Sequence, residues 1–229
     1  MYNFDEKLKK WKNHWLTKDI QVKESYYGDT MFTEIFGVRG FLTPGDVIFL
    51  WDIGLSLPAG GKYLEVGSWQ GLSSVVVGLG LLAKSNFSAR ISCVDVWELM
   101  PEQSKFVNEI QNSDLHEVFL KNIEKAKMNN FVSSFKGKST DIAKTMENNF
   151  YDTIFIDGDH SYEGCYEDLN AWYPKLKTNG KFIGHDAVTD GGVEKAVKQF
   201  CRENDLKYSI IKPPFTHFIW EISSRDKEF

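Results

Sequence analysis

Acidic residues and a histidine stand at or just beyond the ends of short apolar runs in this sequence. Glu65, Asp95 and Asp157 mark three such ends, and His185-Asp186 follows another. Each acid taken alone also fits a helix cap or a turn. In an open α/β sheet, however, the carboxyl ends of neighbouring strands meet at one edge, where ligands bind. Taken together, these residues therefore favour a ligand-binding site with a cluster of carboxylates.

Strands and helices alternate along the chain and would bring these ends together. We expect strands over residues 62–66, 90–94, 131–136, 153–156 and 181–183, and helices over 71–83, 102–128, 139–147, 162–176 and 193–203. This alternation predicts a parallel sheet with helices on both faces. The last two strands, 207–211 and 217–222, leave no room for a helix between them, so they must pair as an antiparallel hairpin. The predicted fold class is α/β, with a seven-stranded, mostly parallel sheet that ends in this hairpin.

A glycine loop, Glu65-Val66-Gly67-Ser68-Trp69-Gln70-Gly71, follows the first of these strands. It lacks the G-x-G-x-x-G spacing of nicotinamide-dependent dehydrogenases, because position 69 is Trp. The loop resembles the E-x-G-x-x-x-G loop of class I S-adenosylmethionine (SAM)-dependent methyltransferases, which have a Rossmann-like fold. The resemblance implies SAM as the cofactor, bound by Glu65, Gly67, Ser68, Gly71, Ser73, Asp95, Val96, Trp97, Ser139, Asp157 and His160.

The resemblance also assigns roles within this set. Glu65 suits the positive charges of SAM, and Asp95 matches the acid that accepts hydrogen bonds from the two ribose hydroxyls. Trp97 is placed against the adenine ring, and Ser139 is placed at the adenine edge.

A second stretch, Ile156 to Tyr162, together with Gly184-His185-Asp186, resembles one branch of this family. The branch includes cephalosporin-hydroxylase-like proteins and metal-dependent macrolide-sugar O-methyltransferases. The resemblance covers about residues 60–186 and does not reach the first 40. It implies a divalent cation, Mg²⁺ or Mn²⁺, held by Asp157, His185 and Asp186. Many relatives carry an acid at the position of His185, so this histidine either shifts the preference from Mg²⁺ towards Mn²⁺ or lies outside the ligand set.

The implied activity is methyl transfer to a hydroxyl of a small molecule, such as a sugar or a secondary metabolite. Asp157 and His160 are the candidate catalytic residues. An imidazole titrates near neutral pH, so His160 is suited to accept the hydroxyl proton. Three alternatives remain open at this point. His160 contacts the adenine or caps the next helix, the methyl acceptor is nitrogen or carbon, or the chain is a non-catalytic SAM-binding or partner-binding protein.

Composition narrows the choice of partner and compartment. The 229 residues carry a net charge of −5 with a pI of about 5.6, which argues against binding to nucleic-acid phosphates. The longest apolar run, 75–83, is too short to cross a membrane. Three scattered cysteines without a C-x-x-C pair, and a charged N-terminal segment in place of a signal peptide, predict a cytoplasmic protein.

The chain divides into two parts by pattern. Residues 1–42 are predicted to be a helical extension that serves as a lid or as an interface for a homo-oligomer, with a helix over 4–16. Thr43-Pro44 then begins a helix and opens the methyltransferase domain, 43–229. The extension and residues 99–130 are expected to cover the acceptor pocket.

Overall fold

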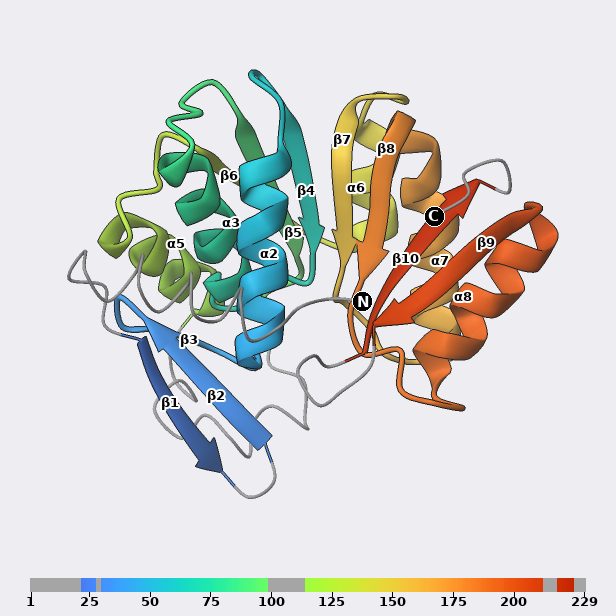
Figure 1. Cartoon of the computed structure of the whole chain (residues 1–229), viewed down its shortest axis with the longest axis horizontal. Helices are drawn as coiled ribbons and strands as arrows, with labels where there is room; N and C mark the ends of the chain where they lie inside the picture. The colour runs from blue at the N-terminus through green and yellow to red at the C-terminus, as the bar shows by residue number, and fades with distance from the viewer. Residues whose placement is uncertain (1–21, 28–29, 99–113, 212–217, 225–229) are drawn as a thin grey trace.

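The main sheet of the protein has seven strands in the order β6-β5-β4-β7-β8-β10-β9 (Figure 1). The computed structural model describes residues 22–27, 30–98, 114–211 and 218–224. The strands are β4 (Lys62–Val66), β5 (Arg90–Asp95), β6 (Val132–Lys136), β7 (Tyr151–Ile156), β8 (Leu176–Gly184), β9 (Leu206–Ile211) and β10 (Ile219–Ser224). β4 to β8 pair in parallel, and β10 pairs antiparallel with both β8 and β9. The predicted fold class is thereby confirmed.

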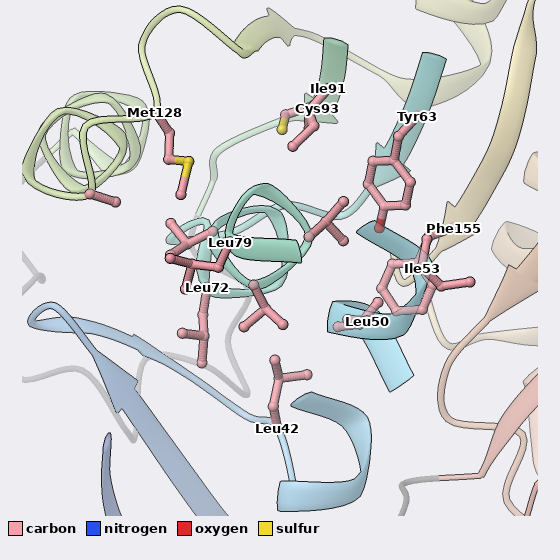
Figure 2. Packing of buried hydrophobic residues seen from close by; sticks show 14 of the residues in the cluster. Leu42, Leu50, Ile53, Tyr63, Leu72, Leu79, Ile91, Cys93, Met128 and Phe155 are labelled. Carbon is pink, nitrogen blue, oxygen red and sulfur yellow. The ribbon is translucent and has the colours of Figure 1, made fainter. Parts of the chain in front are cut away.

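Helices cover both faces of this sheet, as predicted. One face carries α2 (Pro44–Ser56), α3 (Leu72–Ala83) and α5 (Leu115–Lys125), and the other carries α6 (Ser139–Thr145), α7 (Tyr162–Trp172) and α8 (Gly192–Glu203). Successive strand residues point to opposite faces, so the buried side chains form two clusters. Tyr63 packs in the α2–α3 cluster, part of which Figure 2 shows, and Leu64 packs in the other. None of the described helices combines the length and the hydropathy that crossing a bilayer requires.

The boundary between α7 and β8 differs from the prediction. The expected helix over 162–176 ends at Trp172, and a short 3₁₀ turn, Tyr173–Lys175, follows it. Pro174 has no backbone N–H to donate, so it cannot continue the α-helical hydrogen bonds. β8 begins directly afterwards at Leu176, earlier than expected.

The start of α2 is confirmed and is held by a capping box. The Thr43 hydroxyl accepts a hydrogen bond from the Asp46 amide, while the Asp46 carboxylate accepts one from the Thr43 amide at 2.7 Å. Such reciprocal bonds satisfy two backbone donors that the helix itself leaves unpaired. Asp46 is completely buried, which fixes a carboxylate under the first turn of α2.

Residues 22–40 form three strands, so the prediction of a helical extension is wrong for this segment. β1 (Val22–Tyr27), β2 (Thr30–Ile35) and β3 (Val38–Gly40) make a small antiparallel sheet. The turn Phe36-Gly37 has φ values of 55° and 74°, and two positive φ angles are typical of a tight β-hairpin. This turn joins β2 to β3, so the segment forms a hairpin and not a helix. The helix expected over 4–16 and the first part of the one expected over 102–128 lie outside the described residues.

The small sheet is attached to the main domain near the start of α3. The Thr33 hydroxyl donates a buried hydrogen bond to the Leu42 carbonyl at 2.7 Å. Gly40 lies so close to Leu72 that a Cβ at position 40 would be 2.8 Å from that side chain. In Figure 1 the small sheet lies below α2, on the side towards which β8 points. Residues 40–42 therefore reach the carboxyl edge of the main sheet.

The close packing of α2 on α3 depends on glycine and gives a first prediction. A Cβ at Gly54 would be 2.1 Å from the Val77 carbonyl oxygen. We expect Gly54→Ala to lower the free energy of unfolding by about 2–3 kcal/mol in urea titrations, because the helices must separate. Gly60→Ala is the control, since nothing lies within 4 Å of its Cβ and only its φ of 72° opposes the change; about 1 kcal/mol is expected. Equal losses in the two variants would contradict this account.

Candidate active site

A cavity of about 550 Å³ opens at the carboxyl ends of β4, β7 and β8. Its lining combines the glycine loop, the stretch 157–161, the pair His185-Asp186, and residues 40–42 of the N-terminal extension. Its size is that of an ordinary small-molecule site. A second cavity of about 670 Å³, lined mainly by residues 176–181 and 221–223, has no histidine or aspartate in its lining. The carboxyl-edge cavity is therefore the candidate active site.

The glycine loop reaches this cavity because two positions tolerate only glycine. Gly67 has a φ of 86°, and a Cβ there would lie 2.0 Å from the Asp157 carbonyl oxygen. Gly71 has a φ of 91° and directly precedes α3. L-residues with a side chain rarely adopt these angles. Gly67, Gly71 and the intervening Ser68 line the cavity with Ser73, where the prediction placed them.

Glu65 differs from its predicted position. Its side chain is completely buried behind the loop and is absent from the cavity lining. The Ser73 and Ser74 hydroxyls each donate a hydrogen bond to one carboxylate oxygen at 2.8 Å, and the Tyr63 hydroxyl donates to the other at 3.3 Å. Burial raises the pKa of Glu65 to about 7, although the serine hydrogen bonds oppose the rise. Glu65 thus holds the first turn of α3 and does not face a ligand.

Asp95 ends β5 and fixes the backbone on both sides of it. One carboxylate oxygen accepts a hydrogen bond from the Trp69 amide at 2.8 Å, and the other accepts one from the Trp97 amide at 2.6 Å. Burial raises the pKa of this carboxyl, and the backbone hydrogen bonds oppose the rise. Asp95 is not part of the cavity lining. Each of its oxygens keeps a lone pair for a further donor, and its role towards the ribose stays a prediction.

Trp97, Val96 and Ser139, which were predicted to contact SAM, do not face the cavity. The ring of Trp97 is 4% exposed and packs on His116 and Phe119, with ring centroids 4.2 and 4.9 Å away. It therefore lies in the core, and not beside an open adenine site. Val96 is exposed. The Ser139 hydroxyl accepts a hydrogen bond from the Trp172 indole at 2.7 Å, so it is engaged inside the fold. Val96, Trp97 and Ser139 are all absent from the cavity lining.

Asp157, His160 and Asp186 come together at the floor of the cavity. One potential ligand atom from each lies within 4.8 Å of the other two. His160 Nε2 is 3.6 Å from Asp157 Oδ1 and 3.4 Å from Asp186 Oδ2. The nearby carboxylate of Asp157 raises the pKa of His160, and partial burial opposes this rise. His160 does not cap the following helix, because the cap of α7 is Ser161, whose hydroxyl accepts from the Gly164 amide.

His185 lies behind this group and outside the candidate metal group of Asp157, His160 and Asp186, so its role as a metal ligand stays a prediction. It is 3% exposed, and its Nε2 is 3.4 Å from a carboxylate oxygen of Asp46. Its Nδ1 is 3.1 Å from Asp186 Oδ2 and 3.6 Å from Asp157 Oδ1. Burial alone would lower the pKa of His185, but the carboxylates of Asp157 and Asp46 outweigh it and raise the pKa well above its usual value. His160 takes the place of His185 in the candidate metal group.

Three residues of the site were missed from the sequence. Asp46 pairs with His185, and the rings of Phe41 and Trp69 line the cavity. Asp46 carried a signal, because it stands three residues after the helix-capping Thr43. Nothing in the sequence indicated that Phe41 and Trp69 meet.

Sheet order and site together define the class of protein. Five parallel strands followed by an antiparallel pair, with a glycine loop after β4 that lacks the dinucleotide fingerprint, form the Rossmann-like methyltransferase fold. The family model described as "Methyltransferase domain" matches residues 64–187, more than half of the chain. The chain belongs to this family and is a methyltransferase. No curated protein matches the chain by sequence.

Solved structures of low sequence identity share the fold. The O-methyltransferase TomG from Streptomyces achromogenes, involved in tomaymycin synthesis and solved with SAM, is 15% identical with a TM-score of 0.58, and the match covers 78% of each chain. An O-methyltransferase from Bacillus cereus, solved with S-adenosylhomocysteine (SAH), is 14% identical with a TM-score of 0.56, covering 95% of this chain and 90% of that one. A precorrin-6y C5,15-methyltransferase from Geobacter metallireducens is 16% identical with a TM-score of 0.54, covering 78% and 86%.

The buried position of Glu65 leads to a second prediction. A glutamate whose pKa is about 7 in the folded protein and 4.5 otherwise destabilises the fold as it ionises, so stability is lost as the pH rises from 4.5 to 7. Glu65→Gln keeps an oxygen for the serine hydroxyls and removes the charge. Relative to the native chain, we expect its free energy of unfolding to rise by about 3 kcal/mol between pH 4.5 and pH 8, measured by urea unfolding.

Glu117→Gln, which changes an exposed glutamate of α5, is the control, and the pH-dependent gain of Glu65→Gln should exceed the change seen in this variant. A difference for Glu65→Gln that does not change with pH would show that the carboxyl is not buried as described.

Proposed function

We propose that this chain transfers the methyl group of SAM to a hydroxyl of a small molecule, such as a sugar or a secondary metabolite. The observation that carries the proposal is the meeting of the glycine loop at Gly67 with Asp157, His160 and Asp186 in one cavity. Two relatives in fold were solved with SAM or SAH and are named O-methyltransferases, whereas a third is named for methylation at carbon. The proposal that the acceptor is a hydroxyl therefore rests on the group formed by Asp157, His160 and Asp186.

The cavity fits SAM by size, backbone and charge. Gly67 and Gly71 leave the loop backbone open to a ligand, and Asp95 lies at the end of the neighbouring strand. The carboxylates of Asp157 and Asp186 suit a ligand that carries an ammonium and a sulfonium. When bound, SAM supplies an electrophilic methyl group on a positively charged sulfur.

The group formed by Asp157, His160 and Asp186 also fits a divalent cation. Asp157 and Asp186 offer carboxylate oxygens, which both Mg²⁺ and Mn²⁺ accept, and His160 offers a nitrogen, which suits Mn²⁺ better. A bound cation would lower the pKa of an acceptor hydroxyl. One nitrogen cannot bind a metal and accept a proton at the same time. We assign the metal to the two carboxylates and the proton to His160.

His160 acts as the general base in this proposal. Its ring is 56% exposed, so an acceptor can reach it. Asp157 and Asp186 lie 3.6 and 3.4 Å from its Nε2, and they hold the ring and balance the charge that it gains. With SAM bound, the acceptor oxygen would form a bond to the methyl carbon while the carbon–sulfur bond breaks, and the hydroxyl proton would pass to the imidazole of His160. The products are the methyl ether, SAH and the protonated histidine.

Transfer of labelled methyl from SAM into a fraction of small metabolites tests this role. The native chain should bind SAH in a calorimetric titration and should label the fraction. We expect His160→Ala to keep its SAH affinity within about threefold and to lose at least about 100-fold in labelling rate, because general-base catalysis contributes about that much.

His116→Ala replaces a histidine outside the cavity and should retain labelling. Full activity of His160→Ala would remove His160 as the base, and a native chain that fails to bind SAH would refute the proposed function.

The metal proposal is tested with Mn²⁺ alone, followed by electron paramagnetic resonance. Asp186→Asn is expected to weaken binding by about tenfold or more, because the site loses a charged oxygen ligand. His185→Gln should stay within about threefold of the native affinity, because the proposal places His185 behind the two carboxylates as their neighbour and outside the ligand set. A larger loss for His185→Gln than for Asp186→Asn would return His185 to the ligand set.

We propose a cytoplasmic location on the basis of the cysteines. Cys93, Cys165 and Cys201 are free and buried, as thiols commonly are in reducing compartments. The assembly of copies into a homo-oligomer stays a prediction.

A further inference from the structure

The cavity has an aromatic wall that the proposed chemistry does not use. The rings of Phe41 and Trp69 are stacked, with centroids 5.0 Å apart and planes inclined by 29°. Both side chains are partly exposed and line the cavity. Phe41 comes from the segment between β3 and α2, whereas Trp69 comes from the glycine loop. Two distant parts of the chain thus present aromatic surface to one ligand space.

The backbone on each side of this pair is held in place. Next to Phe41, the Leu42 carbonyl accepts the buried hydrogen bond of Thr33, and Gly40 packs on Leu72. The Trp69 amide donates to Asp95, and its carbonyl accepts a hydrogen bond from the Trp97 indole at 2.8 Å. The aromatic wall is therefore formed before a ligand arrives, which reduces the entropy lost on binding.

The rest of the lining carries negative charge. Asp157, Asp159 and Asp186 contribute three carboxylates, and no Lys or Arg is among the described residues of the lining. Carboxylates at short range repel an anion and attract a cation. While no cation is bound to Asp157 and Asp186, the three carboxylates outnumber the imidazoles of His160 and His185. In that state the charge of the cavity disfavours an acceptor that bears a phosphate or a carboxylate.

We infer that Phe41 and Trp69 form the platform for the acceptor, which is a hydroxylated ring that is uncharged or bears an amine. One face of the ring packs on the two aromatic side chains, while its hydroxyls reach Asp157 and His160. The negative face of an aromatic ring attracts C–H groups and ammonium groups, and the carboxylates exclude anions. Phe41 is thereby a specificity-determining residue. This inference rests on the proposed function, because it gives the acceptor of that same site.

Four small molecules test whether binding depends on a ring, on the charge of the ligand, or on hydroxyl groups alone. Methyl glucoside is an uncharged ring, glucosamine bears an amine, glucuronic acid bears a carboxylate, and sorbitol is the open-chain polyol. Saturation-transfer NMR would be recorded on the full chain with SAH bound and with divalent cations removed by a chelator, because a cation on Asp157 and Asp186 would change the charge of the cavity. We expect methyl glucoside and glucosamine to bind, and glucuronic acid and sorbitol to bind at least about fivefold more weakly.

Variants of Phe41 test the platform itself. Phe41→Ala should weaken binding of methyl glucoside by about fivefold, while Phe41→Tyr should restore it. SAH affinity should remain unchanged in both variants. Phe36→Ala is the matched control, since Phe36 lies in the nearby turn between β2 and β3, is 39% exposed and does not line the cavity.

Each contrary outcome has a distinct meaning. Native chain that binds SAH but neither ring probe overturns the inferred acceptor and leaves the methyltransferase proposal standing. The same holds if glucuronic acid or sorbitol binds as well as methyl glucoside. Loss of SAH binding in a folded Phe41→Ala would assign the platform to the cofactor. A native chain that does not bind SAH overturns the proposed function and this inference together.

Discussion

The approach of the Gly67 backbone to the end of β7 is the contact on which the site depends. A Cβ at this position would overlap the Asp157 carbonyl oxygen at 2.0 Å. The neighbouring amides continue the sheet, since Gly67 N–H donates to Val94 and Asp157 N–H donates to Val66 at 2.8 Å each. The ends of β5, β4 and β7 thereby meet in register. Any side chain at position 67 would push the glycine loop away from the end of β7, and so from Asp157.

The sheet was predictable because its signals are local. Short apolar runs, each followed by a turn residue, mark the strands, and the short link before the last strand requires a hairpin. The first 40 residues have a less regular pattern of apolar residues, and the tight turn at Phe36-Gly37 was not predicted. The direction of Glu65 was also predictable in principle. It alternates with Leu64 and Val66, so it shares a face with Tyr63 and points under α3, where Ser73 and Ser74 meet it.

The surroundings of His185 could not be derived from sequence. The motif places His185 beside Asp186, but Asp46, far earlier in the chain, occupies the other side of its ring. Their meeting depends on how α2 packs against the end of β8. Burial disfavours a charged imidazole at this position, and the surrounding carboxylates offset that cost. One buried aspartate thus serves both the start of a helix and the rear of the active site.

The attachment of residues 40–42 to the cavity has an evolutionary consequence. The family match begins at residue 64, so the shared motif contains the glycine loop and the acidic floor but excludes the β3–α2 segment. The family model therefore describes the glycine loop, Asp157, His160 and Asp186, and does not describe Phe41. Kinship across the motif therefore carries over the reaction more safely than the identity of the molecule that is methylated.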